Sequence, residues 1–146
     1  MKLLTPAVNH LLDSWLDEDL GRGDLTASAI GEQLVSAFWI AKQEGVFCGG
    51  LLVKQLFQRL DRSIKVKLLI NDGDHFQTSK RLIELKGPAA SLAAGERTAL
   101  NLAMHLSGIS TATAKLVALL EGTGVRLADT RKTTPGLRIL EKYAVR

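Results

Sequence analysis

Several residue types are scarce in this sequence, and each scarcity excludes certain classes of protein. One cysteine in 146 residues excludes an internal disulfide and favours a reducing, cytoplasmic compartment. Three prolines and 23% charged residues argue against a disordered chain. No uninterrupted apolar run reaches the roughly 18 residues of a membrane span, so we expect no membrane partner. With 46% hydrophobic residues, the chain can bury a core.

Isolated residues of catalytic type are expected to have packing roles. Cys48 has no histidine beside it and lies between Phe47 and two glycines, which favours a buried thiol over a nucleophile. Trp15 and Trp39 are expected in the core. The three histidines are scattered along the chain, so we expect surface or core positions without partners for His10, His75 and His105.

The excess of positive charge is confined to the carboxyl-terminal end of the sequence. The chain has 19 lysines and arginines against 15 aspartates and glutamates. Six of these cations but only two of the anions lie in residues 126–146, so the remaining residues are balanced. A basic cluster suits an anionic small molecule or nucleic acid. Apolar residues and a Pro-Gly pair interrupt the cations, so we expect no nucleic-acid partner.

Local patterns predict a small α+β layer with an antiparallel sheet in the first part of the chain. Thr5 and Pro6 are typical of a helix N-cap and first helical residue. Residues 17–26 are interpreted as a turn and capping segment, and Asp72-Gly73-Asp74 as a turn, because neither has the ligand spacing of a metal site. The apolar periodicity predicts strands at 34–41, 64–70 and 82–85 and a helix at 51–60.

The remainder of the chain has a different pattern. Residues 89–121 are alanine-rich and predict a long helix with a break or kink near Ser107 and Gly108. A buried strand is predicted at 125–129 and a helix at 137–145. One strand and one helix are the opening of a βα repeat, whereas a closed βα barrel takes about 200–250 residues. We therefore expect this chain to be a fragment.

The most informative segment follows the predicted strand and reads Asp-Thr-Arg-Lys-Thr-Thr-Pro-Gly-Leu-Arg over residues 129–138. Ligands of parallel α/β folds bind at the carboxyl ends of strands. Arg131 can place two N–H groups on a carboxylate, and Lys132 adds a compact charge. This pattern predicts an anion site, with a solvated loop as the alternative. Arg138 could bind phosphate or form a salt bridge.

Motifs in the same order along the chain are similar to those of the quinolinate phosphoribosyltransferases, the carboxylating nicotinate-nucleotide pyrophosphorylases of NAD biosynthesis. The motifs that begin at Glu96 and at Glu141 resemble this family more than its molybdenum-transport-associated paralogue. The motifs are Glu18-Asp19-Leu20-Gly21, Gly23-Asp24-Leu25-Thr26, Gly45-Val46, Asp72-Gly73-Asp74, Glu96-Arg97-Thr98-Ala99-Leu100-Asn101, Leu106-Ser107-Gly108-Ile109, Asp129-Thr130-Arg131-Lys132-Thr133, Pro135-Gly136-Leu137-Arg138 and Glu141-Lys142-Tyr143-Ala144-Val145.

The resemblance implies an α/β sandwich over residues 1–108 and the start of an α/β barrel over residues 109–146. It implies that Thr130, Arg131 and Lys132 bind quinolinate and that Arg97 reaches the site of a neighbouring subunit, in a homodimer or larger oligomer. The alternative for Arg97 is an ion pair with Glu96 or Asp129.

The same resemblance implies phosphoribosyl pyrophosphate as the second substrate and Mg2+ as its companion. The catalytic and metal-binding residues are expected beyond Arg146, so we expect no turnover by this chain alone. A second hypothesis is a non-catalytic module that dimerises or binds a partner.

Overall fold

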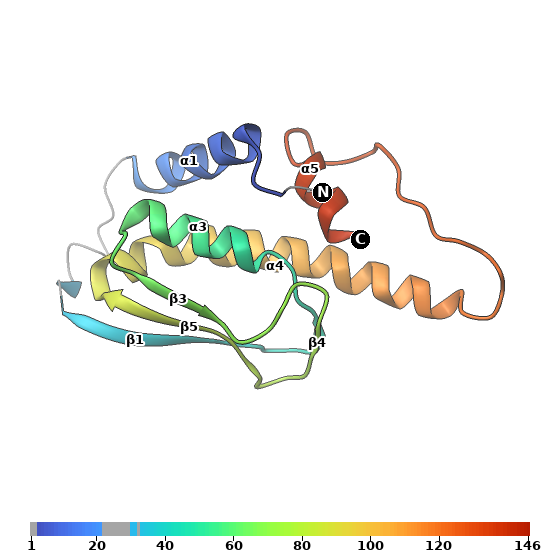
Figure 1. Ribbon diagram of the computed structural model, residues 1–146, viewed down its shortest axis with the longest axis horizontal. Helices are drawn as coiled ribbons and strands as arrows, with labels where there is room; N and C mark the ends of the chain where they lie inside the picture. The colour runs from blue at the N-terminus through green and yellow to red at the C-terminus, as the bar shows by residue number, and fades with distance from the viewer. Residues whose placement is uncertain (1–2, 22–29, 32) are drawn as a thin grey trace.

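The computed structural model describes residues 3–21, 30–31 and 33–146, which form helices packed on antiparallel sheet (Figure 1). This architecture confirms the predicted α+β class, and the sheet is not closed into a barrel. The elements, in chain order, are α1 (Pro6–Leu20), β1 (Leu34–Ile40), β2 (Gly45–Val46), α3 (Gly50–Leu60), β3 (Lys65–Leu68), β4 (His75–Phe76), β5 (Arg81–Pro88), α4 (Ala89–Leu119) and α5 (Arg138–Ala144).

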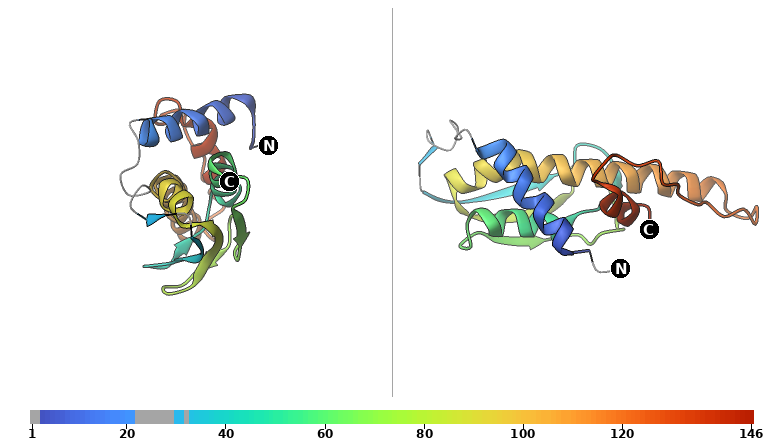
Figure 2. Two further views of the ribbon diagram at one scale, coloured as in Figure 1. Left: turned by 90° about the vertical axis from the view of Figure 1, so that its left-hand side faces the viewer. Right: turned by 90° about the horizontal axis from the view of Figure 1, so that it is seen from above.

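The main sheet has three antiparallel strands in the order β1-β5-β3, with β5 in the centre. Ile83 of β5 pairs with Trp39 of β1 and with Leu68 of β3. A two-stranded ladder of β2 and β4 lies at the end of this sheet. Seen end-on, α3 and α4 cover one face of the sheet, and α1 lies across these two helices (Figure 2). The core is therefore enclosed between the sheet and the helices.

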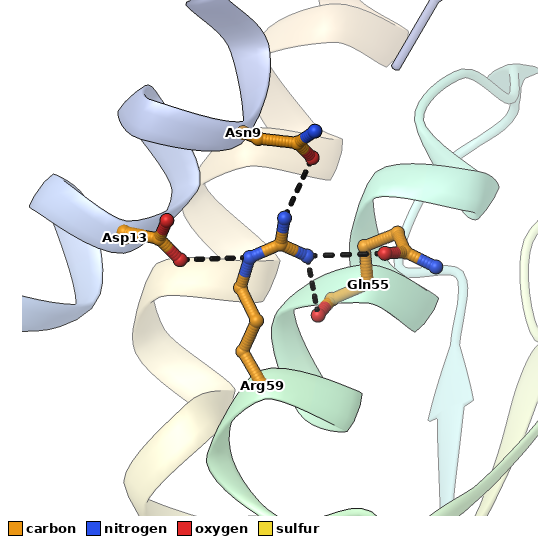
Figure 3. A network of polar contacts seen from close by, with 4 residues as sticks. All are labelled: Asn9, Asp13, Gln55 and Arg59. Atoms are coloured by element: carbon orange, nitrogen blue, oxygen red, sulfur yellow. Dashed lines mark hydrogen bonds and ion pairs between the residues drawn. The ribbon is translucent and has the colours of Figure 1, made fainter. Parts of the chain in front are cut away.

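Helix α1 is joined to α3 by an arginine whose three guanidinium nitrogens all donate hydrogen bonds (Figure 3). Thr5 begins α1 as predicted, its hydroxyl oxygen accepting the Val8 N–H at 3.3 Å. Arg59 of α3 donates from Nε to Asp13 at 2.8 Å and from Nη2 to Asn9 at 2.6 Å. Its Nη1 donates to the backbone and side-chain oxygens of Gln55, both at 3.1 Å. This cation is structural.

Helix α4 is continuous over 31 residues, so a break near Ser107 and Gly108 is wrong, whereas the alternative of a kink there stays a prediction. A glycine costs a helix only about 1 kcal/mol, and Ser107 is held by its side chain, which accepts the Cys48 N–H at 3.0 Å. The helix crosses the predicted domain boundary between residues 108 and 109 without interruption, and that boundary stays a prediction. Cys48 is buried, as expected, and desolvation raises the pKa of its thiol to about 11.

Among the described residues, α4 is the one helix long and apolar enough to cross a bilayer. The amino-terminal part of α4 packs against α3 and β5, and its middle turns contact β2 and α5, whereas Leu116, Val117 and Leu119 near its end are exposed. The length and apolar composition of α4 are therefore only weak support for a membrane span.

The predicted buried strand at 125–129 is wrong. The segment between α4 and α5 is irregular, and Val125 and Leu127 are 60% and 42% exposed. A parallel strand needs a neighbouring strand to pair its backbone groups, and within the described residues no strand lies beside this segment. Figure 1 shows it as a long excursion from the end of α4 back to α5. Helix α5 itself forms as predicted.

Candidate anion-binding site

Three of the predicted ligand-binding residues, Thr130, Arg131 and Lys132, lie on an exposed loop, residues 129–134, which we call the anion loop. Its backbone makes short-range bonds, with the Lys132 N–H donating to Thr130 Oγ1 at 3.1 Å and the Thr133 N–H donating to the Arg131 oxygen at 3.0 Å. All three predicted residues are exposed. Within the part of the chain that the structure describes, the Arg131 guanidinium and the Lys132 ammonium have no hydrogen-bond or ion-pair partner. Their donors are available for a ligand.

Side chains of α5 contact the anion loop along its length. Lys142 Nζ lies 2.7 Å from Asp129 Oδ1 at the start of the loop. Arg138 donates from Nε to Thr133 Oγ1 at 3.1 Å and from Nη2 to the Arg131 oxygen at 3.5 Å. These contacts with the loop are neither the phosphate contact nor the salt bridge expected for Arg138 from the sequence, and both of those roles stay predictions.

The Glu141 carboxylate contacts both the anion loop and helix α4. Its Oε2 accepts the Thr134 N–H at 3.1 Å, and its Oε1 lies 3.0 Å from His105 Nε2 on α4. Hydrogen bonding by Thr134 lowers the pKa of Glu141 against the opposing effect of desolvation, and His105 lowers it further. The expectation that His105 has no partner is therefore wrong, whereas His10 and His75 are exposed, as one of the two expectations for them allowed.

Helix α5 is fixed to the sandwich through Tyr143. Its hydroxyl donates to Asp72 Oδ2 at 2.7 Å, while Asp72 Oδ1 accepts the N–H groups of Gly49 and Gly50 at 3.0 and 2.9 Å. Gly49 has a φ of 106°, which favours glycine, and lacks a side chain to cap α3, so Asp72 supplies the cap from a distant turn. Burial, with the Asp72 hydrogen bond, raises the pKa of Tyr143.

The Asp72-Gly73-Asp74 segment is a turn, as predicted. Asp72 caps α3, and Asp74 Oδ2 accepts the backbone and side-chain N–H groups of Asn71 at 3.0 and 3.1 Å. Among residues 3–21, 30–31 and 33–146, no three His, Cys, Asp or Glu side chains gather where they could hold a metal ion. The turn has a structural role.

Arg97 lies in a cleft of about 380 Å3 between α1 and α4. Its Nε is 3.4 Å from Asp19 Oδ1, and Thr98 Oγ1 donates to Asp19 Oδ2 at 3.3 Å. Asp19 is thus a partner that the sequence alternatives, Glu96 and Asp129, did not include. Much of the predicted turn segment, residues 22–26, lies outside the described residues. The cleft is lined by Trp15, Glu18, Asp19, Arg97, Thr98, Asn101, Leu102, His105 and Leu137.

The structure does not bring Arg97 and the anion loop into the same cleft. The lining of the Arg97 cleft reaches Leu137 but contains none of the loop residues. A second cleft, of about 580 Å3, lies between the end of α4 and residues 125–127, and it too excludes Thr130, Arg131 and Lys132. Trp15 is half-buried at the first cleft, and Trp39 is in the core as expected.

Sequence reasoning missed the residues that hold the loop. Asp72, His105 and Glu141 were seen in motifs or as isolated residues, but their partners are distant in the sequence. The only sequence signal was the Glu141-Lys142-Tyr143 triplet, in which adjacent side chains contact the loop, α4 and the Asp72 turn.

Comparisons with known proteins cover nearly the whole chain. The sequence model of the quinolinate phosphoribosyl transferase N-terminal domain matches residues 24–107, and that of the C-terminal domain matches residues 109–146. The chain is 48% identical over 140 residues to the probable nicotinate-nucleotide pyrophosphorylase [carboxylating] of Bacillus subtilis, covering 95% of this chain and 48% of that protein. It is 37% identical to the Homo sapiens nicotinate-nucleotide pyrophosphorylase [carboxylating], covering 99% of this chain and 50% of the human protein.

Solved structures agree with the sequence matches. The nicotinate-nucleotide pyrophosphorylase from Francisella tularensis superposes with a TM-score of 0.93 at 38% identity, covering 97% of this chain and 52% of that one. NadC from Streptococcus pyogenes gives a TM-score of 0.91 at 35% identity, with the same coverage. The chain thus spans about half the length of the relatives it matches. The chain belongs to the quinolinate phosphoribosyl transferase family.

Proposed function

We propose that this chain forms the first half of an enzyme that makes nicotinate mononucleotide, pyrophosphate and CO2 from quinolinate and phosphoribosyl pyrophosphate in the cytoplasm. The observation that carries the proposal is the match to both family domains, in order, from residue 24 to residue 146. The half-length coverage of the relatives means that the remaining site residues are expected in the second half.

The anion loop is proposed to bind the two carboxylates of quinolinate. Arg131 has a planar group whose parallel N–H donors match a carboxylate, Lys132 adds a point charge, and Thr130 adds a hydroxyl. A hydrogen bond to a charged group contributes about 1.5–3 kcal/mol. The loop would hold the pyridine so that its nitrogen attacks C1 of the ribose. Pyrophosphate leaves with the C1–O bonding electrons, and the 2-carboxylate is then lost as CO2 as a proton replaces it on the ring.

Arg97 is proposed to complete the quinolinate site of a second copy of the chain. The supporting observation is that Arg97 lines a cleft that excludes the anion loop of its own chain. A homodimer or larger oligomer would bring the two together across an interface. The ion pair with Asp19 would then orient the guanidinium.

Magnesium is proposed to accompany phosphoribosyl pyrophosphate in the complete enzyme. The described residues of this chain do not fit a metal site, because they contain no suitable group of three ligands. The ligands would therefore come from the second half, and the proposed roles of Thr130, Arg131, Lys132 and Arg97 do not require the metal.

The second candidate function is a non-catalytic interaction module. The observation that favours it is the exposure of large apolar side chains at the end of α4, namely Leu116, Val117 and Leu119. The names of the relatives favour the nicotinate-nucleotide enzyme over the molybdenum-associated paralogue.

A fusion protein separates these candidates. The second half of the Bacillus subtilis relative is joined after Arg146, and nicotinate mononucleotide is followed by chromatography with both substrates and Mg2+. The enzyme proposal expects turnover by the fusion and none by the 146-residue chain. A fusion that folds and dimerises without turnover would support the module instead.

A further inference from the structure

Side chains of helix α5 hold the anion loop in place. The anion loop pairs with no strand among the described residues, and its internal bonds are local. Its position must therefore be set by side chains from elsewhere. Lys142 holds Asp129 before the predicted ligand-binding residues, and Glu141 holds the Thr134 N–H after them. Arg138 bonds to the loop between these two points.

Helix α5 is itself immobilised by the sandwich. Leu140 is buried in the core, and the Ser110 hydroxyl of α4 donates to the Ala144 oxygen at 2.7 Å. Tyr143 donates to Asp72, which also caps α3. The contacts form a path from α3 and α4 through α5 to the anion loop.

We infer that Glu141 is a positioning residue for the anion loop: its two carboxylate oxygens join His105 of α4 to the Thr134 N–H, and so fix the loop that presents Arg131 and Lys132. The link to substrate binding rests on the proposed function. Glu141 does not touch the ligand. Its effect is to keep the loop in the arrangement that binds the dianion, which lowers the ordering cost of binding.

The first test measures the loop directly in the 146-residue protein. Hydrogen exchange of backbone amides is followed by NMR in the wild type, Glu141→Ala and Glu141→Gln. Glu141→Ala removes the acceptor, and we expect exchange at Thr134 to become about tenfold faster. Glu141→Gln keeps an oxygen that can accept this N–H, so exchange should return close to the wild-type rate.

A matched control separates positioning from general destabilisation. Arg59→Met breaks the contacts of α3 with Asn9 and Asp13 and leaves α5 untouched. It should not change exchange at Thr134 relative to the other amides. Unchanged exchange at Thr134 in Glu141→Ala, or an equal change in Arg59→Met, would overturn the inference.

The second test uses the fusion protein. Glu141→Ala should raise the KM for quinolinate about tenfold while kcat changes less than about twofold, and Glu141→Gln should restore KM. If the wild-type fusion has no turnover, the proposed function fails, and hydrogen exchange alone decides the role of Glu141. If the fusion is active and exchange changes without a change in KM, the positioning role is refuted while the function stands.

Discussion

Two arginines, Arg59 in the sandwich and Arg131 in the anion loop, have opposite environments. Arg59 uses every nitrogen of its guanidinium on Asn9, Asp13 and Gln55 (Figure 3). Arg131 is held only through its backbone oxygen, and its side chain has no partner among the described residues. In the sandwich the chain itself supplies every partner of the Arg59 guanidinium. In the anion loop the cations are ordered through their backbone and remain available, which is the condition for binding a ligand.

The contrast in packing between the two regions is sharpest along α4. Leu106 is fully buried and Leu119 is 77% exposed on the same helix. Leu106→Ala leaves a cavity and should lower the free energy of unfolding by about 3–5 kcal/mol. Leu119→Ala, the matched control, should change it by less than about 0.5 kcal/mol. Urea unfolding of both variants measures this, and similar losses would mean that the end of α4 is packed in solution.

The contrast between the two arginines predicts opposite outcomes for binding and stability. Arg131→Ala in the fusion protein should weaken quinolinate binding by about 2–5 kcal/mol. The same change in the 146-residue chain should alter the free energy of unfolding by less than about 0.5 kcal/mol, because the side chain has no described partner. Calorimetry and urea unfolding provide the two values. Unchanged quinolinate binding would remove Arg131 from the site.

Arg59→Met should show the reverse pattern. It removes hydrogen bonds between α1 and α3, and because Asp13 is largely exposed the loss of stability should be only about 1–2 kcal/mol. Arg62→Met, an exposed arginine just after α3, is the control and should have little effect. Quinolinate binding by the fusion should not change in either variant. A binding defect in Arg59→Met would show that α1 contributes to the site.

The sequence predicted the helices and antiparallel strands of the first part of the chain well because the patterns that indicate them are local. The alternation in residues 64–70 and the Thr5-Pro6 helix start depend on neighbours a few residues away. The strand at 125–129 failed because a strand's stability comes from partners, which the described chain does not supply. The partner of His105 lies 36 residues away, and that of Tyr143 lies 71 residues away. Residue types thus indicated the loop that is proposed to bind a ligand, and only the structure identified the side chains that hold this loop.

The smallest expected effect is on the stability of the fold at acidic pH. Hydrogen bonding by Thr134 lowers the pKa of Glu141 from its ordinary 4.5, and hydrogen bonding by Ser63 lowers that of Asp61 at the end of α3. A carboxyl group with a lower pKa in the folded state stabilises the fold fully above its unfolded pKa, and this contribution disappears as the pH falls through the folded value.

Glu141→Gln and Asp61→Asn should therefore each make stability less sensitive to acid, one through the loop anchor and the other through the sandwich. Urea midpoints from neutral pH down to about pH 3 measure this, and the double variant should show the sum because the two sites share no partner. A Glu141→Gln profile identical to that of the wild type would mean that the Thr134 contact is not formed in solution, and α5 would then hold the loop only through Lys142 and Arg138.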